Sequence, residues 1–98
     1  MRIIKQKVLK DFWESGCGDS EQALKSWYHI CKQSTFNDPI DIKRIFASAS
    51  FIGNNRVIFN IKGNKYRLVV HIRYDLQIMF IRFIGTHAEY SKINVNEV

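Results

Sequence analysis

The chain has 98 residues, of which 46% are hydrophobic and 24% are charged, and its formal net charge at pH 7 is +6. This composition excludes a disordered chain, and the length suits one domain with a modest core, which we expect to span residues 1–98. No apolar run reaches the length of a membrane span, and the residues after Met1 lack the apolar region of a signal peptide. Cys17 and Cys31 lie fourteen residues apart, which is no metal-ligand spacing, so we expect a cytoplasmic protein with two free thiols.

The first third of the chain has the patterns of one short strand and two helices. Residues 2–4 contain β-branched side chains, and we expect them to add an edge strand to a later sheet. Residues 5–15 and 19–33 carry apolar side chains at helical spacing, which predicts two amphipathic helices. The short connection between them favours a helical hairpin that covers one face of the sheet.

Four residues of these helices have patterns that favour a structural role. Asp19 is a good candidate for the N-cap of the second helix, because Gln22 follows three residues later, as in a capping box. Trp13 and Trp27 lie within the apolar helical stripes, so we interpret them as core anchors rather than as platforms for stacked bases. This part of the chain therefore contributes no candidate site residue.

Asp38 and Pro39 have the residue types of a helix N-cap and first helical position, which predicts a short third helix. Its inward-facing side chains are expected to be Ile42, Ile45 and Phe46. Residues 47–55 are small and polar, and we expect them to form only a connection.

Residues 56–74 predict a β-hairpin, because two alternating segments flank Gly63-Asn64. Gly at the first central position suits a type II′ turn. That turn places Asn60 opposite Arg67 and fixes which side chains share a face. One face is apolar, and the other carries Arg56, Ile58, Asn60, Lys62, Lys65, Arg67, Val69, His71 and Arg73.

Residues 77–84 are apolar on both sides, which is typical of an interior strand. Together the elements predict an α+β fold, with the helical hairpin packed on a twisted, mainly antiparallel sheet. A two-residue turn at Asp75-Leu76 would place Arg82 on the face of Arg67, whereas a three-residue loop would reverse it. The polar chain after Lys92 is expected to fray.

The positive charge is concentrated on the hairpin and the strand after it. Residues 56–82 carry a net charge of +5, whereas residues 1–55 carry +2 and residues 83–98 carry −1. Like charges opposed across a sheet cost stability, so the concentration favours contact with a polyanion such as nucleic acid. The alternative is a solvated sheet face, on which Lys and Arg only block edge pairing.

His87 and Tyr90 follow the strand that delivers Arg82, and these residue types can carry out RNA cleavage. Arg can bind a phosphate bidentately, Lys can neutralise developing charge, and His or Tyr can transfer a proton. They suffice for metal-free cleavage, in which the ribose 2′-OH attacks its own phosphate. The alternative is a strand-end cap at His87 and a core position for Tyr90. No metal-ligand or nucleophile motif is present, so we expect no cofactor.

Three segments resemble the HigB-type toxins of the RelE/ParE superfamily of bacterial toxin–antitoxin modules. They are VIFNIKGN at residues 57–64, GNKYRLVV at residues 63–70 and IRFIGTHAEY at residues 81–90, and the likeness extends over nearly the whole chain. The resemblance implies an mRNA interferase that needs no metal and cuts translated messages, often in the ribosomal A site. It also implies a cognate HigA-like helix-turn-helix antitoxin, through which alone the protein would reach operator DNA.

The resemblance also implies roles for individual residues, since RelE-like sites join basic residues of the central hairpin to an Arg and an aromatic or His near the C-terminus. The catalytic candidates are Lys65, Arg67, Arg82, His87 and Tyr90. Further RNA-binding candidates on the polar hairpin face are Arg56, Lys62, Asn64, His71 and Arg73. The sequence THAEY departs from the RelE pattern at His87, which leaves open whether His87 or Tyr90 is the base and whether Glu89 takes part. Two other functions remain possible: a non-catalytic RNA- or ribosome-binding module, and a ParE-like gyrase inhibitor.

Overall fold

Five strands form one mixed sheet in the computed structural model, which describes residues 1–98. Their order across the sheet is β1 (Arg2–Ile4), β5 (Ile78–Thr86), β4 (Tyr66–Arg73), β3 (Arg56–Ile61) and β2 (Ser50–Ile52). β1 runs parallel to β5, and the other neighbouring strands are antiparallel. The predicted edge strand and interior strand are both confirmed, and the fold class is α+β, as expected.

β2 lies within residues 47–55, where the sequence predicted only a connection. It pairs with β3, with Phe51 opposite Val57. Between the two strands, Asn54 and Asn55 have φ angles of 61° and 57°, a conformation that Asn tolerates better than most residues. Unlike residues 2–4, this strand holds a single β-branched residue within a small and polar segment, which is why the sequence did not predict it.

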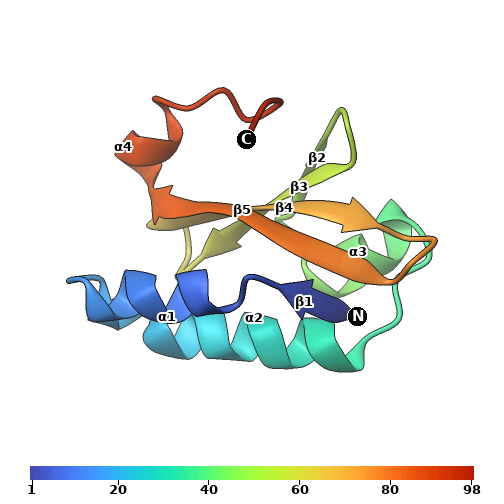
Figure 1. The fold of residues 1–98 in the computed structure, drawn as a ribbon, viewed down its shortest axis with the longest axis horizontal. Coiled ribbons are helices and arrows are strands. Elements are labelled where there is room, and N and C mark those ends of the chain that lie inside the picture. The colour runs from blue at the N-terminus through green and yellow to red at the C-terminus, as the bar shows by residue number, and fades with distance from the viewer.

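Two helices, α1 (Lys7–Glu14) and α2 (Glu21–Gln33), lie below the sheet in Figure 1. The Met1 amino group donates to the Cys31 carbonyl oxygen near the end of α2, at 3.0 Å. Since β1 leads into α1, the chain leaves this point through α1 and returns through α2. α1 begins later than predicted, because Lys5 has a φ of 69° and is not helical. No helix is both long and apolar enough to span a membrane.

The capping box expected at Asp19 is wrong. A short 3₁₀-helix, η1 (Gly18–Ser20), precedes α2, and Ser20 stands at the N-cap without a side-chain cap. The Asp19 carboxylate instead accepts hydrogen bonds from Lys65 and Tyr66 of the sheet. Two side-chain donors, one of them cationic, thus replace the single backbone N–H that a cap would supply.

The third helix, α3 (Pro39–Ile45), begins as the sequence predicted, since Asp38 Oδ1 accepts the Asp41 N–H at 3.1 Å. Ile42 is fully buried, but Ile45 is 50% exposed, contrary to expectation. The reason is that the ring of Phe46, on the other side of Ile42, takes the inward position against Phe59.

The hydrophobic core lies between the helices and one face of the sheet. Trp27 is 2% exposed and packs edge-on against Phe59, with ring centres 5.4 Å apart. Trp13 is half-buried against the same cluster. Both tryptophans are therefore core anchors, as predicted. The hairpin side chains in the core are those that alternation indicated: Val57, Phe59, Ile61, Tyr66, Leu68, Val70 and Ile72.

The predicted hairpin register is confirmed, with Asn60 opposite Arg67. The outer face of the sheet, however, is not cationic throughout, because Ile58 and Val69 in its middle are only 5% and 0% exposed. α4 (His87–Tyr90) and the chain that follows it lie above this face in Figure 1. The polar tail thus ends over the sheet, where the Val98 carbonyl oxygen accepts a hydrogen bond from β3.

Lys62 and Lys65 lie in the loop directly beyond Ile61 and Tyr66, the last pair of the ladder, and the Lys65 N–H donates to the Lys62 carbonyl oxygen at 3.2 Å. Gly63 has a φ of 64°, the sign that the first central position of a type II′ turn requires. Lys62 also has a positive φ, of 53°, so the residue before the turn is not in an extended conformation.

A β-bulge in β5 decides where Arg82 lies. β5 shifts register against β4 between Val69 and Val70, which leaves Arg82 as the extra residue. Its guanidinium carbon lies 5.5 Å from the ring centre of Phe80, which pairs with His71 on the outer face. The loop before β5 has four residues, so neither predicted turn length is correct, although Arg82 does reach the outer face.

Candidate functional site

The candidate site residues separate into two groups along the β3–β4 hairpin and its neighbours. The first surrounds the β3–β4 loop and the start of α4. We call it the Arg67 group, and it consists of Lys62, Lys65, Arg67, His87 and Tyr90. The second lies towards the other end of the same strands, beside the bulge. We call it the Arg82 group, and it consists of Arg56, His71, Arg73 and Arg82.

Arg67 is held by a neutral amide and an aromatic ring. Its Nη1 donates to Oδ1 of Asn60, directly opposite on β3. Its guanidinium carbon lies 5.8 Å from the ring centre of Tyr90, which in turn lies 6.5 Å from that of Phe83. Arg67 forms no ion pair with a carboxylate, and its Nε is buried without a hydrogen-bond partner. Its positive charge is therefore oriented but not neutralised.

α4 is attached to this site by two sets of hydrogen bonds. Thr86 Oγ1 accepts the Glu89 N–H at 3.1 Å, and the Glu89 carboxylate accepts the Thr86 N–H at 2.8 Å, which is a capping box. These bonds to Thr86 hold the pKa of Glu89 below its ordinary value. The His87 N–H donates to the Lys65 carbonyl oxygen at 3.3 Å, which joins α4 to the hairpin loop. Glu89 is thus engaged as the cap of α4.

Neither structural alternative for His87 and Tyr90 fits these contacts. The cap at the end of β5 is Thr86, and His87 is exposed as the first residue of α4. Tyr90 is half-buried beside Arg67 and does not belong to the hydrophobic core. Both side chains therefore lie at the edge of the basic face, as the chemistry proposed for them requires.

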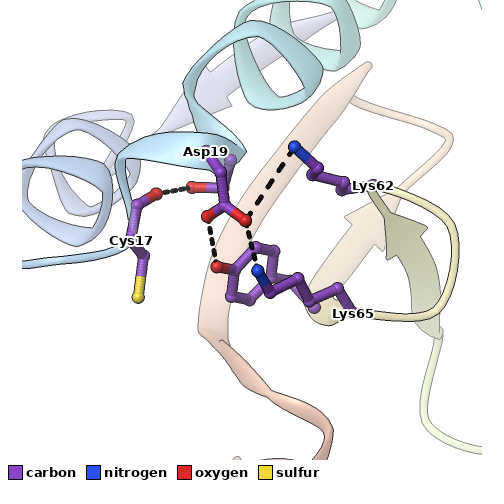
Figure 2. Close-up of polar contacts among 6 residues, drawn as sticks. Cys17, Asp19, Lys62 and Lys65 are labelled. Carbon is purple, nitrogen blue, oxygen red and sulfur yellow. Dashed lines mark hydrogen bonds and ion pairs between the residues drawn. The ribbon is translucent and has the colours of Figure 1, made fainter.

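The two lysines of the Arg67 group extend to Asp19 in the helical layer, as Figure 2 shows, and not over the outer face on which the sequence predicted them. Nζ of Lys65 donates to Oδ2 of Asp19, and Nζ of Lys62 lies 3.9 Å from the same oxygen. The hydrogen bond between Lys65 and Asp19 lowers the pKa of the carboxyl and raises the pKa of the ammonium. Asn64, the remaining polar candidate here, is exposed in the same loop.

In the Arg82 group, Arg56 and Arg73 have partners within the protein. Arg73 forms an ion pair with Asp75 at 2.8 Å, and Arg56 donates to two backbone carbonyl oxygens, at 3.0 and 2.7 Å. His71 has a buried Nδ1 without a partner. Burial, and then the nearby charges of Arg56, Arg82 and Arg73, lower the pKa of His71 below its ordinary value. The environment of His71 therefore favours the neutral imidazole.

The structure places Arg67 and Arg82 on the outer face without joining them, and it turns Lys62 and Lys65 towards the helical layer. Arg67 lies against Tyr90, whereas Arg82 lies against Phe80 on the far side of the bulge. Sequence reasoning missed Asp19, whose contact with Lys65 spans 46 residues and leaves no local signal. No cluster of three or more His, Cys, Asp or Glu side chains is arranged to hold a metal ion.

Comparisons with known proteins identify the family of the chain. Residues 20–93 match the HigB toxin family, described as the RelE-like toxic component of a toxin-antitoxin system, and the chain belongs to this family. It is 30% identical, over 92 residues, to the mRNA interferase toxin HigB of Escherichia coli K12. This alignment covers 92% of this chain and 88% of that protein. The mRNA interferase HigB of Shigella flexneri matches with the same identity and coverage. The mRNA interferase HigB of Escherichia coli O6:H1 is 29% identical over 73 residues, or 72% of this chain and 71% of that relative.

Proposed function

We propose that this protein is an endoribonuclease toxin that cleaves mRNA on the translating ribosome. The names of its relatives support mRNA as the substrate. Both are called mRNA interferases, and each matches this chain over most of the length of both proteins. The concentration of positive charge on residues 56–82 supports contact with an RNA backbone.

The proposed reaction is attack of a ribose 2′-OH on the adjacent phosphate, with departure of the 5′-oxygen. One of His87 and Tyr90, as the free imidazole or the phenolate, accepts the proton of the 2′-OH. The other residue or a water molecule donates a proton to the leaving 5′-oxygen, so that the products are a 2′,3′-cyclic phosphate and a free 5′-OH. Negative charge accumulates on the non-bridging phosphate oxygens, and a fixed cation beside them lowers the barrier. The groups of this chain suffice for these steps without a metal or other cofactor.

The observation that carries the proposal is the environment of Arg67. Asn60 and Tyr90 orient its guanidinium, and it forms no ion pair with a carboxylate. A buried structural Arg would need such a partner. The contact with Tyr90 also puts a candidate proton-transfer group beside the phosphate that Arg67 would hold.

The partners we propose are mRNA, the ribosome and a HigA-like helix-turn-helix antitoxin, with operator DNA reached only through the antitoxin complex and the cytoplasm as the compartment. We expect the antitoxin to cover or distort the basic face or the segment 87–90. A complex that leaves both open and undistorted would instead favour a steric block of ribosome entry.

Induction of the toxin in bacteria, with mapping of RNA ends on bulk message, tests the proposal. We expect growth arrest and new 5′ ends within translated regions, and their loss when translation is blocked. Arrest with damaged DNA and intact message would favour a gyrase inhibitor, and RNA binding without new ends would favour a non-catalytic module.

A further inference from the structure

Asp19 places a carboxylate in the middle of three donors from the β3–β4 hairpin (Figure 2). Its Oδ2 accepts a hydrogen bond from Nζ of Lys65 and lies 3.9 Å from Nζ of Lys62. Its Oδ1 accepts the hydroxyl of Tyr66, whose residue is only 3% exposed. The buried phenol therefore fixes one carboxylate oxygen, while the other faces two lysines at the surface.

Local structure does not explain this position, because Asp19 caps no helix. The 3₁₀-turn that carries it is closed by the Ser20 hydroxyl, which donates to the Cys17 carbonyl oxygen at 2.6 Å. That turn directs the carboxylate across to the sheet (Figure 2). The contact thus joins the helical layer to two lysines that the resemblance to HigB-type toxins makes candidates for RNA binding and catalysis.

The contact is of a kind that another anion can replace. The side chains of Asp19 and Lys65 are 32% and 57% exposed, and exposed ion pairs of this type add little to stability. A phosphodiester resembles a carboxylate in carrying one negative charge and two exposed acceptor oxygens. The loop is also next to the remainder of the Arg67 group, because the Lys65 carbonyl oxygen accepts the His87 N–H.

We propose that Lys62 and Lys65 form a subsite for a phosphodiester of the RNA backbone, which the free protein fills with the Asp19 carboxylate. Binding of RNA transfers the two ammonium groups from Asp19 to the phosphate, while the Tyr66 hydroxyl stays on the carboxylate. This inference rests on the proposed function and adds an internal competitor to it. The Asp19 carboxylate competes with the RNA phosphate for the two ammonium groups and so weakens RNA binding through the lysines.

The test is the affinity of the purified protein for a single-stranded 2′-O-methyl oligoribonucleotide, which lacks the attacking hydroxyl and reports binding alone. Asp19→Asn keeps an acceptor for Tyr66 and removes the competing charge. We expect it to bind about threefold or more tighter at 50 mM salt. We also expect the slope of log K against log salt to steepen by about 0.7 to 1.4, the contribution of one or two phosphates.

The matched control is Glu21→Gln, which makes the same charge change two residues away, where Glu21 pairs with Lys25 at 2.6 Å. It should change affinity much less. In a Lys62→Gln, Lys65→Gln background, Asp19→Asn should have no further effect, because its partners are gone. Thermal melting of each variant verifies that the fold is kept.

Equal affinity and slope for Asp19→Asn and Glu21→Gln would overturn the subsite, as would a persistent effect of Asp19→Asn without the lysines. Either result leaves the proposed cleavage standing. A wild-type protein that binds the oligonucleotide but makes no message ends would overturn the cleavage and leave the subsite standing. A wild-type protein that does not bind the oligonucleotide would overturn the subsite, and the mapped message ends would decide the cleavage separately.

Discussion

Arg67 differs from the other cations of the basic face in what surrounds it. Lys65 and Arg73 each have a carboxylate, whereas Arg67 has an amide and a ring. An amide and a ring orient a guanidinium without neutralising it, so the charge stays available to a ligand. The same strand carries His71, whose pKa is lowered by burial and by the nearby arginine charges.

Replacement of Arg67 by Ala should abolish most cleavage and keep the fold. We expect a loss of roughly 10²-fold or more, which is the scale for removal of one donor to the transition state. Arg67→Lys should restore activity only in part, since Lys cannot make a two-pronged contact. The measurements are mapped cleavage and thermal melting. Arg44→Ala removes a cation that is 74% exposed on α3 and is the control. Full toxicity in Arg67→Ala would rule out the assignment, and lost toxicity with a much lower melting temperature would make Arg67 structural.

His71 should make folding stability depend on pH between its folded pKa and its ordinary value of 6.5. In that range the unfolded chain binds the proton and the folded chain does not, so stability rises with pH and falls on acidification. His71→Gln has no such proton. We therefore expect wild type to lose more stability than His71→Gln between pH 7.5 and 5.5 in urea denaturation. Parallel losses would show that the environment of His71 is not as described.

At the scale of elements, the site depends on the junction of β5 with α4. The bulge places Arg82 on the outer face, and the capping box starts α4 immediately after Thr86. Four residues are too few to form a stable helix alone, so tertiary contacts must hold α4 in place. One such contact is made at Gly85, which pairs with Arg67 on β4. The side chains of Phe83 and Glu89 pack directly over this glycine.

Gly85→Ala should therefore damage activity more than folding. A Cβ at this position would lie 2.6 Å from the Phe83 ring and 3.1 Å from a Glu89 carboxylate oxygen, so both must move. Overpacking of this kind costs about 1–3 kcal/mol. A misplacement of about 1 Å can cost 10²-fold in rate, and we expect cleavage to fall at least about tenfold. Gly53→Ala is the control, because nothing lies within 4 Å of its Cβ. Equal cleavage by the two variants would show that α4 does not position the site.

For the whole molecule, the formal charge overstates what is available to RNA. Residues 56–82 carry a net +5, but Asp19 engages Lys65 and approaches Lys62 from outside that segment. Arg67 and Arg82 alone among its cations lack a partner that is either a carboxylate or a backbone carbonyl oxygen. Electrostatic attraction should thus concentrate at two guanidiniums on one face.

RNA binding by wild type should accordingly weaken steeply with salt. Two phosphates neutralised on a single strand give a slope of about −1.4 for log K against log salt, and further contacts make it steeper. Binding isotherms of a single-stranded oligonucleotide between 50 and 200 mM salt measure this slope. A flat response would remove the electrostatic basis of the proposed RNA contact.

The sequence by itself determined the α+β class, the hairpin register and the core face of the sheet. Each follows from local rules: side-chain alternation, helical periodicity and a turn between Lys62 and Lys65. The motifs at residues 57–70 and 81–90 further indicated the family, which the comparison with HigB toxins confirmed.

Only the tertiary structure decided the position of Arg82, the cap of α4 and the partner of Asp19. An alternation pattern does not reveal a bulge, because one extra residue shifts every side chain after it. Asp19 has the local signature of a cap, yet its carboxylate accepts hydrogen bonds from Lys65 and Tyr66, which are 46 and 47 residues away in sequence. Such contacts depend on how the helical layer meets the sheet, and sequence spacing carries no information about that distance.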